Sequence, residues 1–143
     1  MAPGAAGRTM VVGEAMIVAG LGSRADVRAE DILAAVRAAA ARYGVPLGRI
    51  GRLATGERKS SQPAFAEAAL KLGIPLEIMG EAALADVAGR TLTRSGHSQA
   101  LTGLPSLSEA AALAAAGEGS ALLGPRIALG PVTCALAQSG GRA

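Results

Sequence analysis

Short apolar runs alternate with longer segments of helical period along most of this chain, and this alternation restricts the fold more than any other feature. Four segments carry apolar residues at helical spacing between plausible end signals. These predicted helices span residues 29–44, 63–73, 81–87 and 107–116. The predicted strands are the apolar runs at 14–22, 49–55, 74–79, 120–124 and 132–137. Strands separated by helices predict an α/β layer structure.

The order of these segments predicts the layers in more detail. We expect a three-layer α/β/α fold with a mixed, mostly parallel sheet of about five strands. The last two strands follow each other without a helix between them, so at least one pair should be antiparallel. We expect one domain over residues 14–138, a disordered leader at 1–13 and a disordered tail at 139–143. Residues 88–105 have no firm period and predict a long mobile segment.

Several residues predict where the helices begin and which way they face. Asp26 is a candidate cap for the helix at 29–44. In the helix at 63–73, Glu67 and Lys71 are spaced to pair on the outer surface. Ser106 and Glu109 have the spacing of a capping box for the last helix.

Composition excludes several classes of function. The 143 residues carry a formal net charge of +3, and the basic residues are scattered rather than clustered. Tyr43 and Phe65 are the only aromatic residues, so the stacking platforms of single-strand binders are missing and we expect no nucleic-acid partner. No apolar run reaches the ~18 residues of a membrane span, so we expect no membrane partner. The single cysteine, Cys134, excludes an internal disulfide and fits a reducing compartment, so we expect a cytoplasmic protein.

Two polar loops follow the first two predicted strands and are the best candidates for a site. The first carries Gly20, Gly22, Ser23 and Arg24 in "GLGSRA". The second is "TGERKSSQ", whose candidate residues are Thr55, Glu57, Arg58, Lys59 and Gln62. Ligands of α/β sheets bind outside the carboxyl ends of the strands, so both loops should lie on one binding edge. Thr55, Glu57 and Lys59 alternate along the chain and should face a ligand together.

Other interpretations of these loops stay open. The first loop matches G-x-G-x-x-A, which favours a dinucleotide site, but the acidic residue expected about 20 residues later is missing. A tight turn that needs glycine explains the same residues. The second loop also fits a solvated turn before a helix. An anion or polar-ligand site, in which loop N–H groups, Ser23 and Arg24 meet carboxylates, is the third interpretation.

Catalytic and metal-binding signals are weak. His97 is the only histidine, and a chain with one His and one Cys offers no paired metal ligands, so we expect no metal site. Cys134 alternates with Val132 and Leu136, which predicts a core position. If the chain is an enzyme, Glu57 beside Lys59 is the best candidate for a general base.

Four stretches of the chain together carry a family resemblance: "VAGLGSRADVRAEDILAAVRAA", "LATGERKSSQPAFAEAALKLGIPLEIM", "LTGLPSLSEAAALAAAG" and "ALLGPRIALGPVTCALA". They resemble the CobE/CbiG family of cobalamin biosynthesis proteins, and specifically its stand-alone members and the carboxy-terminal domain of CbiG. The family's first loop reads G-[IL]-G-C-R-[RK]-G, and Gly20, Gly22 and Arg24 match it. Its second loop reads T-x-[DE]-x-K-x-x-E-P, and Thr55, Glu57, Lys59 and Pro63 match it. Ser23 stands in place of the family cysteine and Gln62 in place of the second acid, which argues against catalysis by those two positions.

The resemblance also implies roles for two residues outside these loops. Ser98 falls near a family serine, and Arg126 stands where the family often has lysine.

The resemblance implies a role in building the corrin ring. We expect a protein that binds or hands on a corrinoid or precorrin intermediate, with no cofactor other than that tetrapyrrole as substrate or cargo. Its carboxylates would meet Arg24, Arg58, Lys59 and Arg126. The alternative function is lactone opening of the cobalt-precorrin-5A hydrolase type, with loss of a two-carbon unit. We expect a monomer or small homo-oligomer whose protein partners are other cobalamin-pathway enzymes.

Overall fold

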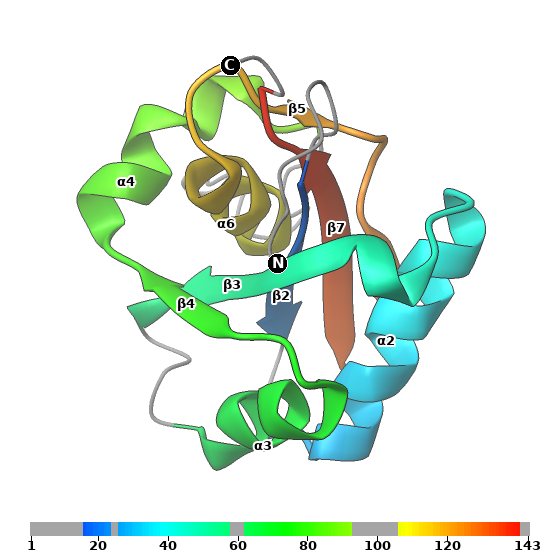
Figure 1. The fold of residues 1–143 in the computed structure, drawn as a ribbon. Helices are drawn as coiled ribbons and strands as arrows, with labels where there is room; N and C mark the ends of the chain where they lie inside the picture. The colour runs from blue at the N-terminus through cyan, green and yellow to red at the C-terminus, as the bar shows by residue number, and fades with distance from the viewer. Residues whose placement is uncertain (1–15, 24–25, 58–61, 93–105, 141–143) are drawn as a thin grey trace, which may run out of the picture.

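The computed structural model describes residues 16–23, 26–57, 62–92 and 106–140, and their core is a six-stranded sheet (Figure 1). The strand order is β4-β3-β2-β7-β5, with β6 paired to β7. The strands are β2 (Ile17–Ser23), β3 (Ile50–Gly56), β4 (Leu76–Met79), β5 (Ala121–Leu122), β6 (Ile127–Leu129) and β7 (Val132–Gln138). β2 is parallel to β3 and β3 to β4, whereas β7 is antiparallel to β2, β5 and β6. All the other strands therefore point one way and β7 alone points back, which confirms the predicted mixed, mostly parallel sheet.

Helices cover both faces of this sheet, as predicted. On one face lie α2 (Ala29–Arg42) and α3 (Pro63–Leu72), and on the other α4 (Glu81–Asp86) and α6 (Leu107–Ala116) (Figure 1). The first face buries a core that includes Ile32, Leu53 and Phe65. The second core includes Val18 and Leu113. The two separate cores confirm the three-layer α/β/α arrangement.

The layer of α6 lies unusually close to β2. A Cβ on Gly20 would collide with the carbonyl of Ser108 and lie 2.6 Å from the backbone nitrogen of Ala112. A Cβ on Gly22 would lie 2.9 Å from the hydroxyl of Thr133. The interpretation of these glycines as a turn is therefore wrong, because both lie inside β2. Gly20 makes room for the backbone of α6, and Gly22 for the side chain of Thr133 in β7. The dinucleotide interpretation loses its support for the same reason, since its glycines open a helix.

Two local predictions are corrected by long-range or neighbouring contacts. Asp26 does not cap α2; the helix is capped at Arg28, whose backbone N–H donates to the carboxylate of Asp31 at 3.0 Å. The segment between the predicted strands at 120–124 and 132–137, which we expect to be a turn, contains β6, because Ile127–Leu129 pairs with β7. The first residues of the predicted mobile segment form a short 3₁₀ helix, η3 (Ala88–Arg90), and another, η1 (Leu47–Arg49), precedes β3.

Other local predictions are confirmed. Pro63 opens α3, and Glu67 lies 3.8 Å from Lys71 on its outer surface. Cys134 is buried in the core, and burial raises the pKa of its thiol to about 12. In the part of the chain that the structure describes, no helix has the length and apolar character needed to cross a membrane.

The ends of the predicted domain are described only in part. Ser139, the first residue of the predicted tail, exchanges hydrogen bonds of 2.9 Å with Met16. The predicted leader, residues 93–105 of the predicted mobile segment and residues 141–143 lie outside the described residues.

Candidate functional site

The two polar loops leave the sheet at the same edge, as predicted, because β2 and β3 are parallel neighbours. The helices α2 and α3, which follow these loops, begin at this edge. α6 also begins here: its first residue, Leu107, reaches within 3.0 Å of the position of a Cβ on Gly56, the last residue of β3. The positive ends of three helices therefore gather around the carboxyl ends of β2 and β3. We call this region the carboxyl edge.

On the α2–α3 side, the carboxyl edge is an open groove of about 550 Å³. Its lining consists of the first turns of both helices and the residues before them: Asp26, Val27, Arg28, Ala29, Glu30, Gln62, Pro63, Ala64 and Glu67. Gln62 is the one predicted site residue among them. Arg24, Arg58 and Lys59 lie outside the described residues, so their place at the groove stays a prediction.

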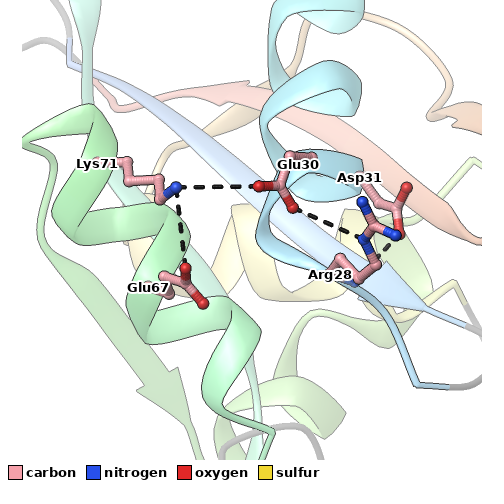
Figure 2. A network of polar contacts seen from close by, with 5 residues as sticks. All are labelled: Arg28, Glu30, Asp31, Glu67 and Lys71. Atoms are coloured by element: carbon pink, nitrogen blue, oxygen red, sulfur yellow. Dashed lines mark hydrogen bonds and ion pairs between the residues drawn. The ribbon is translucent and has the colours of Figure 1, made fainter.

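A chain of ion pairs crosses the rim of this groove (Figure 2). Glu30 of α2 lies 3.8 Å from Arg28 and 3.9 Å from Lys71 of α3, and Lys71 lies 3.8 Å from Glu67. All four side chains are between 46% and 79% exposed. Pairs this exposed are screened by water and contribute little to stability.

Two hydroxyl groups lie beneath the groove at the ends of the strands. Thr55 is fully buried, and its hydroxyl donates to the carbonyl of Leu21 at 2.9 Å, which joins β3 to β2. The hydroxyl oxygen of Ser23 is buried and has no hydrogen-bond partner among the residues that the structure describes. A buried hydroxyl without a partner costs free energy, so Ser23 is a group that a bound ligand or water would satisfy.

Glu57 lies just beyond the end of β3 and is exposed. One of its carboxylate oxygens is 3.6 Å from the position of a Cβ on Gly80, the residue that caps α4. Its carboxylate therefore lies between the end of β3 and the start of α4. Because the structure does not describe Lys59, the predicted common orientation of Thr55, Glu57 and Lys59 stays a prediction.

The α6 side of the carboxyl edge holds a polar cluster of three buried residues and one partly buried arginine, which we call the α6 cluster: Ser106, Ser108, Glu109 and Arg126. Ser106 caps α6 as predicted, accepting from the backbone N–H of Glu109 at 3.4 Å. Its oxygen also lies 3.1 Å from the hydroxyl of Ser108 and accepts from the guanidinium of Arg126 at 3.3 Å. The carboxylate of Glu109 accepts from the backbone N–H groups of Leu92 at 2.7 Å and Arg126 at 2.9 Å.

The α6 cluster includes one predicted site residue, Arg126, and three that the sequence did not single out for a site. Ser106 and Glu109 were predicted as a helix start, since "SLSE" is a local capping signal. Ser98 lies outside the described residues.

The α6 side of this edge suits an anion, because it offers the guanidinium of Arg126, hydroxyl groups and the N-terminal end of α6. The described lining of the α2–α3 groove carries the carboxylates of Asp26, Glu30 and Glu67 and the guanidinium of Arg28. Among the described residues, no group of three or more histidine, cysteine, aspartate or glutamate side chains is arranged to hold a metal ion.

Comparison with known proteins identifies the family. The family model for the cobalamin synthesis G C-terminus matches residues 17–137. The chain belongs to this CobE/CbiG family. It is therefore a protein of cobalamin biosynthesis. It is 32% identical to Protein CobE of Sinorhizobium sp over 121 residues, which is 85% of this chain and 79% of that protein.

Solved structures of the same family share the fold. CobE, a protein from the cobalamin (vitamin B12) biosynthetic pathway, superimposes with a TM-score of 0.78 at 30% identity, over 87% of this chain and 90% of that one. The cobalamin biosynthesis protein chiG of Agrobacterium tumefaciens superimposes with a TM-score of 0.71 at 44% identity, over 87% of this chain and 98% of that one. A cobalamin biosynthesis protein G homolog of Sulfolobus solfataricus has the same fold, with a TM-score of 0.66 at 23% identity, and there the match covers 37% of a longer chain.

Proposed function

We propose that this chain binds a corrinoid intermediate of cobalamin biosynthesis at the carboxyl edge and hands it to another enzyme of the pathway. The observation that carries the proposal is the gathering of three helix starts and the guanidinium of Arg126 around the ends of β2 and β3. Corrinoid intermediates carry many acetate and propionate carboxylates. Helix starts and guanidinium groups are the protein groups that bind carboxylates best.

The macrocycle itself would rest on aliphatic surface. Both aromatic residues of the chain are in its described part, and neither offers a ring at this edge. Phe65 is fully buried, and Tyr43 caps the far end of α2, where its hydroxyl donates to the carbonyl of Pro125. Affinity would therefore come mainly from the carboxylates.

A titration followed by visible absorbance tests this proposal. Cobyrinic acid, a corrinoid whose peripheral acids are free, should bind saturably and shift its spectrum. Cobalamin, in which these acids are amides, should bind more weakly because amides are poorer partners for a guanidinium. If neither corrinoid binds the folded protein, the proposal fails.

Lactone opening on a precorrin is the second candidate, and the position of Glu57 favours it. An exposed carboxylate just beyond the end of β3 is placed to act as a general base on a ligand at this edge. Single-turnover assays of the wild type and Glu57→Gln, at equal saturation with a lactone-bearing precorrin, separate the candidates.

The outcomes of that assay are distinct. A carrier gives no reaction in either protein and retains binding in Glu57→Gln, because the amide keeps one acceptor and nearly the same shape. A hydrolase that uses Glu57 reacts in the wild type and loses about two to four orders of magnitude in rate in the variant. Equal rates in both proteins would exclude Glu57 as the base.

A further inference from the structure

Glu109 is a fully buried carboxylate that joins three distant parts of the chain. It belongs to the first turn of α6, and its two oxygens accept from Leu92, just after η3, and from Arg126, just before β6. Burying a carboxylate is costly, and hydrogen bonds from N–H groups offset that cost. A capping residue does not require such burial, so the position of Glu109 calls for a further explanation.

Arg126 is held at both ends by the first turn of α6. Its backbone N–H donates to Glu109 at 2.9 Å, and its guanidinium donates to the hydroxyl of Ser106 at 3.3 Å. Arg126 is only partly buried, so part of this residue remains accessible to solvent. The segment before it is also fixed from the other face of the sheet, because the hydroxyl of Tyr43 donates to the carbonyl of Pro125 at 2.7 Å. This guanidinium is therefore pre-positioned at the carboxyl edge.

We propose that Glu109 is a positioning residue: it holds the backbone of Arg126 so that the guanidinium meets a carboxylate of the bound corrinoid. This inference rests on the proposed corrinoid binding. When the guanidinium is already ordered, binding does not include the entropic cost of ordering it. Glu109 therefore raises affinity without touching the ligand.

Glu109→Gln is the sharpest probe, because the amide has nearly the same shape but only one accepting oxygen. One of the two backbone N–H groups then faces an NH₂ group instead of an acceptor. Arg126→Ala complements Glu109→Gln, because alanine removes the guanidinium but keeps the backbone N–H, which still donates to Glu109. A purely structural role of Glu109 is therefore intact in the Arg126→Ala background, whereas the positioning role has no guanidinium left to act on.

The experiment is a double-mutant cycle with cobyrinic acid, read by absorbance titration. Arg126→Ala should weaken binding by about 10- to 100-fold, and Glu109→Gln by about tenfold. In the Arg126→Ala background, Glu109→Gln should cause no further loss of affinity. The loss of thermal stability that Glu109→Gln causes should be equal in the wild-type and Arg126→Ala backgrounds. Glu118→Gln, an exposed carboxylate just beyond α6, is the matched control and should bind like the wild type.

Each outcome has one meaning. Additive losses of affinity in the double variant, or no loss in Glu109→Gln, would overturn the positioning role while leaving corrinoid binding intact. A wild type that does not bind cobyrinic acid would overturn the proposed function itself, and the inference with it. Should Glu109→Gln fail to fold, Glu109→Asp takes its place in the same cycle, since the shorter carboxylate keeps its charge but draws back from the backbone N–H of Arg126. Additivity there would equally overturn the proposal.

Discussion

The two sides of the carboxyl edge are built in opposite ways. On the α2–α3 side, charged side chains are exposed and lie 3.8–3.9 Å from one another across an open groove. On the α6 side, polar groups are buried and joined by hydrogen bonds, the shortest being 2.7 Å. Exposed pairs adjust to salt and to neighbours, whereas buried, satisfied networks hold one geometry.

This difference suggests a division of roles. Under the proposed function, the α6 side would present a guanidinium whose place is set before the ligand arrives. The α2–α3 side would offer the ligand space and adaptable side chains. We therefore expect the α6 side to be sensitive to small changes and the α2–α3 side to be tolerant.

The largest effect should come from Gly20→Ala, which tests how rigid the α6 side is. The new Cβ would collide with backbone atoms of α6 at Ser108 and Ala112, and backbone in a packed helix cannot move aside cheaply. We expect a loss of at least about 3 kcal/mol in the free energy of unfolding, at the upper end for overpacking. Urea unfolding measures it.

Gly48→Ala is the control for that measurement. Gly48 lies in η1, and a Cβ there would meet no atom within 4 Å. Its effect should stay within about 0.5 kcal/mol, as for most surface substitutions. Equal stability of Gly20→Ala and Gly48→Ala would mean that α6 can shift on the sheet, and the contrast between the two sides would fail.

The same contrast explains what the sequence could and could not predict. Helix period and cap signals predicted α3 and α6 closely, because those signals are local. Gly20 and Gly22 were misinterpreted because their close neighbours, α6 for Gly20 and Thr133 of β7 for Gly22, come far later in the chain. Glu109 was predicted as a local cap, whereas its carboxylate reaches Leu92 and Arg126. The strand β6 was missed because pairing with β7, rather than its own three residues, stabilises it.

The next effect concerns the two polar loops, which we predict to border the α2–α3 side. Arg24→Ala and Lys59→Ala should each weaken binding of cobyrinic acid by about 1.5–3 kcal/mol, the value of a lost charged hydrogen bond. Arg37→Ala, on the exposed surface of α2, is the matched control and should leave the absorbance titration unchanged. Unchanged titrations for both loop variants, with the fold intact, would confine carboxylate binding to the α6 side.

A third effect tests the apolar layer beneath the groove through Cys134. The thiol has an ordinary pKa of 9.0, and burial raises the pKa to about 12 in the folded chain. Between these values the folded chain keeps a proton that the unfolded chain loses. Stability is therefore fully present below pH 9.0 and falls as pH rises, by about 1 kcal/mol per pH unit.

Comparison with Cys134→Ala isolates this contribution, since other groups titrate equally in both proteins. The difference in unfolding free energy between wild type and variant should shift by about 1 kcal/mol between about pH 8 and pH 10. A difference independent of pH would show that water reaches the thiol, and the layer beneath the groove would not be dry.

The smallest effect should come from Glu30→Gln, which removes the carboxylate that joins α2 to α3. Its partners Arg28 and Lys71 are exposed and lie at 3.8 and 3.9 Å, so water and salt screen both attractions. We expect the free energy of unfolding to fall by less than about 1 kcal/mol at low salt and to be unchanged at high salt. Glu67→Gln, which breaks the pair within α3 and leaves the link to Glu30, is the matched control. If Glu30→Gln, but not Glu67→Gln, lowered the free energy of unfolding by more than this and did so at high salt as well, the ion pairs would be holding the two helices in place. The groove would then be as fixed as the α6 side, and the distinction between an adaptable and a pre-positioned side would no longer hold.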